Sequence, residues 1–241
     1  MVKRIKGITL VELLISITVF SILLLILSQV WISIQRDTFI QKTDIELERS
    51  LSNVITNLRS SIQRAIVIYT PGMTISINDT SGSKYSVGNY SFDTSTQGIV
   101  LVSPITNNNY RFDIFVVRSR TGSLYDPANP NAKILLYYSK VISWTPNYNQ
   151  GNITNFVKNF TFTSSESPKV LADYIASNGF KYKYLYLDSQ SGTYSFFELT
   201  SATYTPGKKV QQLEVSIKLQ KRWGQFIREK STTLRFSPIT F

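Results

Sequence analysis

The clearest pattern in the chain is a long apolar segment near its start. The 20 residues from 13 to 32 are apolar apart from serines, Thr18 and Gln29. At about 1.5 Å per residue, a helix over this segment would be about 30 Å long, which is enough to cross the hydrocarbon core of a bilayer. The three basic residues within positions 1–7 predict that the N-terminal end stays in the cytoplasm. Residues 8–32 are therefore predicted to be the transmembrane segment of a single-pass protein of the cytoplasmic (inner) membrane, with the C-terminal domain outside the cytoplasm.

The helical pattern continues beyond this segment in amphipathic form. Apolar residues recur at spacings of three and four, and two more widen the stripe. The stripe consists of Leu47, Leu51, Val54, Leu58, Ile62 and Ala65, widened by Ile55 and Ile66. No proline or glycine interrupts positions 8–70. The pattern predicts one helix from about residue 8 to about residue 68, amphipathic over residues 33–70. We interpret the stripe as packing against a soluble domain rather than as a coiled-coil seam.

From Pro71 onward the pattern changes to that of β-strands. Some segments are rich in β-branched and aromatic residues, and others alternate between apolar and polar positions, which predicts strands. The predicted strands are 110–117, 134–138, 160–163, 180–187, 213–219 and 226–236. The sequence Trp223-Gly224-Gln225 suits a hairpin turn between the last two. The chain is therefore predicted to have an α+β fold in which residues 71–241 form a β-rich extracytoplasmic domain.

Composition limits the chemistry available to the chain. Cysteine and histidine are both absent, which excludes disulfides, iron–sulfur clusters and thiolate zinc sites and removes the commonest metal ligand and general base. No phosphate-binding, dinucleotide-binding or metalloprotease motif occurs. The aspartates are too dispersed to form an EF-hand calcium loop. We therefore expect no enzyme activity, no catalytic residue, no cofactor and no metal site.

The chain is basic, which bears on its partners. The formal charge is +11, and without the three basic residues of positions 1–7 it is +8. This charge is compatible with nucleic acid or anionic lipid as a partner, but the basic residues are scattered through the predicted strands, as on a solvated surface. Several tyrosines offer rings that could stack on bases, although their alternation favours packing within a sheet. These tyrosines are Tyr182, Tyr184, Tyr186, Tyr194 and Tyr204.

Glu12 is the unexpected residue of the apolar segment. A carboxylate at the start of a membrane span is unfavourable and usually has a partner or a function. A secretory signal peptide has a shorter apolar region followed by small residues at its cleavage site, and a plain signal anchor leaves Glu12 unexplained. Cleavage after Gly7 would place the new amine of Ile8 four residues before Glu12. The remaining alternative for Glu12 is an interfacial carboxylate that reaches to water.

Residues 6–13, Lys-Gly-Ile-Thr-Leu-Val-Glu-Leu, resemble the type III signal sequence of bacterial type IV pilins and type II secretion pseudopilins. The resemblance implies that prepilin peptidase removes the leader, residues 1–7, by cutting after Gly7 on the cytoplasmic side, and then methylates the new N-terminus at Ile8. It also implies that Glu12 serves subunit assembly and that the second half of the helix packs on an antiparallel β-sheet.

Two residues depart from the pattern of that family. Phenylalanine is usual at the position of Ile8, which weakens the expectation of methylation more than that of cleavage. Gln29 stands in the region where major pilins carry a helix-breaking proline, which argues against a major pilin.

Later segments carry a second and less specific resemblance. Residues 170–175 and 180–184, together with the closing hairpin, are similar to the large J-type minor pseudopilins and W-type minor pilins, which lie near filament tips. The large predicted domain and the missing C-terminal cysteine pair also differ from many major pilins. The resemblance implies a structural subunit at or near the tip of a type IV pilus or a type II secretion-like filament. Its implied partners are prepilin peptidase, other pilin or pseudopilin subunits, the inner-membrane assembly platform and membrane lipid.

An alternative function shares the same N-terminus. The chain could be a pilin-anchored binding module whose basic domain captures DNA or a surface. A contiguous basic face would favour this module, whereas dispersed charge would favour the structural subunit. The sequence leaves open whether the machine is a type IV pilus, a type II secretion system or a competence pseudopilus.

Overall fold

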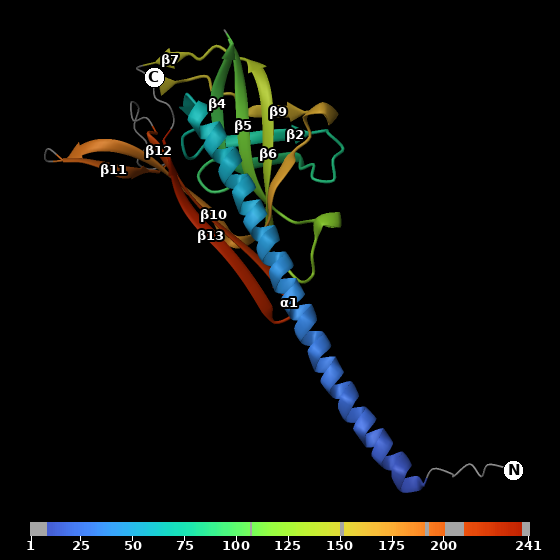
Figure 1. The fold of residues 1–241 in the computed structure, drawn as a ribbon. Helices are drawn as coiled ribbons and strands as arrows, with labels where there is room; N and C mark the ends of the chain where they lie inside the picture. Colours follow the sequence, from blue (N-terminus) through green and yellow to red (C-terminus); the bar gives the residue numbers. More distant parts are fainter. Residues whose placement is uncertain (1–8, 107, 150–151, 191–192, 201–209, 238–241) are drawn as a thin grey trace. The chain divides into compact units, whose positions relative to one another are not determined.

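The computed structural model describes residues 9–106, 108–149, 152–190, 193–200 and 210–237 of the 241-residue chain. The chain divides into two compact units, Met1–Ile45 and Glu46–Phe241. The first unit contains the N-terminal part of one long helix. The second contains the rest of this helix and every described strand (Figure 1).

Helix α1 spans Leu10–Arg64, which is 55 residues. The strands follow in the order β1 (Val67–Ile68), β2 (Thr74–Asp79), β3 (Gly88–Asp93), β4 (Gly98–Thr106), β5 (Asn109–Ser119), β6 (Lys133–Ser143), β7 (Tyr148–Asn149), β8 (Asn152–Ile153), β9 (Asn159–Phe162), β10 (Lys169–Gln190), β11 (Thr193–Leu199), β12 (Gln212–Trp223) and β13 (Phe226–Phe236). Two short 3-10 helices, η1 (Gly122–Leu124) and η2 (Ser164–Glu166), lie between them.

The helix ends at Arg64, four residues before the predicted end at residue 68. The N–H of Ala65 donates to the carbonyl of Ile62 at 3.1 Å, which tightens the last turn. The N–H of Ile66 donates to the carbonyl of Val102 at 2.9 Å, and β1 continues this pairing with β4. The β-branched residues after the helix therefore extend the sheet instead of the helix.

The main sheet confirms the predicted antiparallel architecture. Its strand order is β1-β4-β5-β6-β10-β12-β13, with β11 paired to β10, and every neighbouring pair is antiparallel. Strands β12 and β13 pair along their length, from Leu213 opposite Phe236 to Trp223 opposite Phe226. Gly224 opens the two-residue turn between them with φ +56°, a conformation that glycine adopts without strain.

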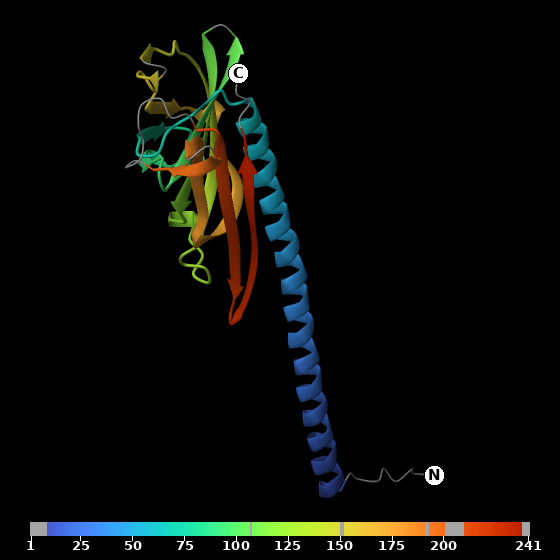
Figure 2. The ribbon, with the colours of Figure 1, turned by 90° about the vertical axis from the view of Figure 1, so that its left-hand side faces the viewer.

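One face of the main sheet packs against the second half of α1 (Figure 2), forming what we call the helix-side core. The stripe positions that are at most 1% exposed are Leu47, Val54, Leu58, Ile62 and Ala65. Ile66 is 38% exposed, so the predicted widening of the stripe at this residue is wrong. Burying a leucine or isoleucine side chain contributes about 1.5–3 kcal/mol. The amphipathic half of α1 is therefore a major element of the core of the second unit.

A smaller sheet covers the other face of the main sheet and forms the far-side core. Its strand order is β3-β2-β9, and β2 pairs with β9 in parallel. The small sheet contributes Ile75, Ile77, Phe92, Phe160 and Phe162, each at most 2% exposed. The second unit thus consists of three layers, helix, main sheet and small sheet, of which the sequence predicted two.

Strand β10 carries an irregularity that places a tyrosine at positive φ. The register of β10 against β6 shifts between Ala172 and Ile175, and Tyr174 between them has φ +59°. This conformation costs a non-glycine residue about 1–2 kcal/mol. Two cations lie close to the ring of Tyr174, with the guanidinium of Arg120 4.4 Å and the ammonium of Lys221 4.5 Å from its centroid. These cation–π contacts offset part of the strain.

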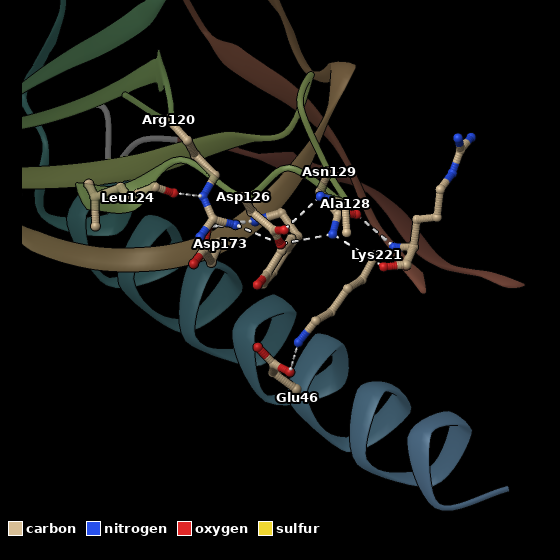
Figure 3. A network of polar contacts seen from close by, with 10 residues as sticks. Glu46, Arg120, Leu124, Asp126, Ala128, Asn129, Asp173 and Lys221 are labelled. Carbon is tan, nitrogen blue, oxygen red and sulfur yellow. Dashed lines mark hydrogen bonds and ion pairs between the residues drawn. The ribbon is translucent and has the colours of Figure 1, made fainter. Parts of the chain in front are cut away.

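The same cations join β10, β12 and α1 in one polar network (Figure 3). Arg120 Nη1 lies 3.3 Å from Asp173 Oδ1, and Arg120 Nε donates to the carbonyl of Leu124 at 2.7 Å. Lys221 Nζ donates to the carboxylate of Glu46 on α1 at 2.6 Å. Burial raises the pKa of Asp173, and Arg120 opposes this effect. Arg120 therefore stabilises a carboxylate that its surroundings destabilise.

Arg120→Met is expected to lower the free energy of unfolding of the second unit by about 1–3 kcal/mol, because Asp173 loses its ion-pair partner and the carbonyl of Leu124 loses its hydrogen bond. Lys158→Met removes an exposed lysine outside the network and is expected to change this free energy by less than about 0.5 kcal/mol. Chemical denaturation of the full chain in detergent micelles, followed by tryptophan fluorescence, measures both. Equal midpoint shifts for the two variants would contradict the assigned role of Arg120.

Candidate functional site: the start of the long helix

The three residues predicted to carry function lie at the start of the chain. Glu12 is in the first turn of α1. Gly7 and Ile8 lie outside the described residues, so cleavage after Gly7 and methylation of Ile8 stay predictions. The geometry of the site is therefore that of Glu12 and its neighbours on the helix.

Glu12 and Thr9 form a reciprocal capping box. The N–H of Thr9 donates to Glu12 Oε2 at 2.8 Å, and the hydroxyl of Thr9 donates to the same oxygen at 3.0 Å. In return, the N–H of Glu12 donates to Thr9 Oγ1 at 3.3 Å. The carbonyl of Thr9 accepts the first backbone bond of the helix, from the N–H of Leu13 at 3.1 Å. These bonds satisfy backbone donors that a helix start otherwise leaves unpaired.

Thr9 is the residue that the sequence reasoning missed. The spacing Thr-x-x-Glu directly before an apolar run is itself a signal for a capping box, and residues 9–12 contain it. Both hydrogen bonds from Thr9 end on Glu12 Oε2. In the described part of the chain no donor is bonded to Oε1, so this oxygen can accept a hydrogen bond from another group. The carboxylate also lies at the positive end of the helix dipole, which favours its charge.

The apolar part of α1 has the surface expected of a membrane span. It is the one described helix that is long and apolar enough to cross a membrane, and none of its most apolar window is buried. Its large hydrophobic side chains from Leu10 to Ile34 are all at least 50% exposed. A surface of this kind needs lipid or other apolar helices around it.

The hydroxyl groups of this span are satisfied within the helix. Ser16, Thr18 and Ser21 each donate to the backbone carbonyl four residues earlier, at 2.8 Å in every case. Ser28 donates to the carbonyl of Leu25 at 2.8 Å. Such bonds make hydroxyl groups compatible with a hydrocarbon environment. The hydroxyl groups of the predicted transmembrane segment are therefore compatible with a position inside the bilayer.

The described residues contain no group of three or more histidine, cysteine, aspartate or glutamate residues that could hold a metal ion. The tyrosines are part of the sheet: the hydroxyl of Tyr184 donates to the carbonyl of Thr94 at 2.8 Å, and that of Tyr182 to the carbonyl of Gly98 at 2.9 Å. Tyr204 and the side chain of Tyr194 are outside the description.

Cations on the closing hairpin alternate with carboxylates. Ion pairs of β12 and β13 include Lys218–Glu229 at 2.8 Å, Lys221–Glu46 at 2.6 Å, Lys230–Glu48 at 2.7 Å and Arg235–Glu214 at 2.6 Å. Exposed pairs of this kind contribute little to stability. They offset part of the positive charge of these two strands.

Comparison with known proteins agrees with this geometry. A family model described as the prokaryotic N-terminal methylation motif matches residues 2–28. No match was found among curated proteins or among solved structures.

The fold and the matched motif support a membrane-anchored protein of pilin-like α+β architecture, with one long N-terminal helix packed on a large antiparallel sheet. The matched motif is the prepilin signal of type IV pilins and pseudopilins. It supports processing by prepilin peptidase, N-terminal methylation and assembly with other pilins.

Proposed function

We propose that this protein is a minor pilin or pseudopilin, a structural subunit that assembles at or near the tip of a type IV pilus or a type II secretion-like filament. The observation that carries the proposal is the position of the prepilin signal relative to α1. Residues 2–28 match the methylation motif, Glu12 lies in the first helical turn, and the apolar surface that follows is exposed. A helix of this kind anchors a subunit in the membrane and then packs among like helices in a filament.

Two features support a minor rather than a major subunit. Helix α1 runs without interruption through Gln29, where major pilins carry a helix-breaking proline. The second unit is large and has the additional sheet β3-β2-β9. The basic leader supports an orientation with the N-terminus in the cytoplasm and the second unit outside.

In this proposal Glu12 pairs with the amine of Ile8 that cleavage releases, on a neighbouring or initiating subunit. The capping box supports the pairing because it fixes the carboxylate at the first turn of the helix, three residues beyond Thr9. Charge neutralisation at this depth favours insertion of the subunit among its neighbours. The assembly platform of the inner membrane and membrane lipid are the further partners.

The test is the identity of the mature N-terminus and the location of the subunit. We expect mass spectrometry of protein from filaments to find a chain that begins at Ile8. Gly7→Val is expected to abolish processing, because a β-branched side chain would crowd a protease subsite that fits glycine, and the unprocessed chain should be absent from filaments. Immunogold labelling of the processed protein should mark filament ends. A mature chain that begins at Met1 or beyond Ile32 would refute the pilin assignment, and uniform labelling along the shaft would refute the tip position.

A further inference from the structure

Strand β10 has an irregular register at residues 176–179, which lie beside a cleft in the second unit. Ile175 is the last residue of β10 that pairs with β6, opposite Lys133, and regular pairing with β12 resumes at Phe180. Residues 176–178 line a cleft together with residues 95–97 and the end of β5, and this half-open cleft has a volume of about 560 Å³. This volume is within the range of small-molecule sites.

The backbone approaches closely at Gly179, in the irregular part of β10. A Cβ atom at this position would lie 2.2 Å from the carbonyl oxygen of Lys218 and 2.8 Å from the backbone nitrogen of Ala176. Both neighbours are backbone atoms, so no side-chain rotation relieves the clash. The irregular course of β10 here therefore requires a residue without a Cβ at position 179.

The cleft is lined by four cations and one carboxylate. Arg118 is held by its own bonds, from Nη1 to the carbonyl of Ser86 at 2.9 Å and from Nη2 to the hydroxyl of Thr121 at 2.8 Å. Lys183 pairs with Glu198 at 3.1 Å. Lys133 and Lys181 form no ion pair with the described residues, although Lys133 is half-buried.

Polar and aromatic groups make up the rest of the lining. Hydroxyl and amide groups come from Ser95, Thr96, Gln97, Ser177 and Asn178. Tyr90 and Tyr182 add half-buried aromatic rings. Uncompensated lysines attract an anion, and hydroxyls and amides match a polyhydroxylated ligand.

We propose that this cleft binds an anionic saccharide unit. The anionic group, a carboxylate or a phosphate, lies between Lys133 and Lys181, and the sugar hydroxyls meet Gln97, Ser177 and Asn178. This activity goes beyond the assembly role and does not depend on it. It would give the filament a chemical preference for surfaces that carry acidic sugars.

A nucleic acid strand fits the cleft less well than a saccharide. Base stacking needs a ring with an accessible face. The hydroxyl of Tyr182 donates to the carbonyl of Gly98 at 2.9 Å and accepts from the N–H of Gly98 at 3.0 Å. Its ring packs against Phe180 and Tyr184, with both pairs of centroids 5.6 Å apart. Tyr182 is therefore fixed in the wall and not free to rotate out toward a base.

The experiment measures binding of defined probes to the purified full chain in nonionic detergent. The probes are trigalacturonate, which carries carboxylates, glucose 6-phosphate, which carries a phosphate, neutral maltotriose and a short oligothymidylate. The variants are Lys133→Gln, Lys181→Gln and Ser177→Trp, which fills the cleft without a change of charge. Lys158→Gln is the matched control, because it removes the same charge at an exposed position outside the cleft.

We expect at least one anionic sugar to bind and maltotriose to bind at least about tenfold more weakly, since a charge-assisted contact is lost. Each lysine variant is expected to weaken binding of that sugar about tenfold. Ser177→Trp should abolish binding, and Lys158→Gln should leave it unchanged.

Failure of both anionic sugars to bind, or an equal loss in Lys158→Gln, would overturn the proposal. Oligothymidylate that binds more tightly than the sugars and depends on the same residues would also overturn it, in favour of nucleic acid. Processing and filament assembly are not measured here, so a negative result leaves the assembly role standing.

Discussion

A chain that lacks residues 1–35 is expected to fold as a soluble, sheet-rich protein, and a chain that lacks residues 1–66 is expected to aggregate. The shorter deletion removes the exposed apolar surface of α1 and leaves Glu46–Phe241, which is a compact unit with its own core. The longer deletion also removes Leu47, Val54, Leu58, Ile62 and Ala65, each at most 1% exposed. The large side chains among them contribute about 1.5–3 kcal/mol each when buried. Their loss also leaves one face of the main sheet uncovered.

Circular dichroism and size-exclusion chromatography of the two fragments measure this difference. A predominantly helical or disordered spectrum for the shorter deletion would contradict the assigned architecture. A matched pair of point variants isolates the helix-side core within the folded fragment. Leu58→Asp places a carboxylate at a fully buried position and should prevent folding, whereas Thr56→Asp adds the same charge at an exposed position two residues earlier and should be tolerated.

Helix α1 and its buried stripe are predictable because helical packing is a local pattern. Leu58 and Ile62 are one turn apart and therefore lie on the same face of the helix. This apolar face packs against the main sheet. The end of the helix is less predictable. Val67 and Ile68 continue the apolar pattern equally well in a helix or a strand, and their pairing with Val102 and Leu101 decides between the two.

The far-side sheet shows why the remaining layer was not predicted. Strand β2, with the sequence TISIND, is short and ends in residues typical of turns. Its last residue, Asp79, is nonetheless 4% exposed, because Tyr138 donates to its carboxylate at 2.8 Å across 59 positions of the chain. Contacts between residues far apart in the sequence can bury polar residues whose local sequence is typical of an exposed loop.

The two candidate sites differ in the same way. Gly7 and Glu12 belong to one short segment, so their spacing can be read directly from the sequence, and the Thr9 capping signal was there to be read as well. The proposed saccharide cleft lies beside an irregularity in β10, and Lys133 and Lys181 both line it. No local sequence pattern predicts that these two lysines line the same cleft, because this follows from the register of strands far apart in the chain.

The structure also separates two roles of Glu12, its negative charge and its place in the capping box. Glutamine at this position can still accept the hydrogen bond from the N–H of Thr9, because the capping box uses glutamate or glutamine. Glu12→Gln therefore removes the charge and keeps the cap. Thr9→Val removes the hydroxyl bonds of the cap and keeps the charge. Glu12→Leu removes both.

If Glu12 pairs with the released amine of Ile8 during assembly, Glu12→Gln is expected to insert and to be processed normally but to enter filaments several-fold less than the wild type. Glu12→Leu should be more defective in assembly, although its apolar side chain favours insertion. Thr9→Val should assemble almost as well as the wild type, because helix capping contributes only about 1 kcal/mol. Three measurements separate insertion, processing and assembly. They are membrane abundance, leader processing and co-purification with filaments, each normalised to the preceding one. Normal co-purification of processed Glu12→Leu would show that the carboxylate is dispensable. A defect in Thr9→Val as large as that in Glu12→Gln would assign the effect to the cap instead of the charge.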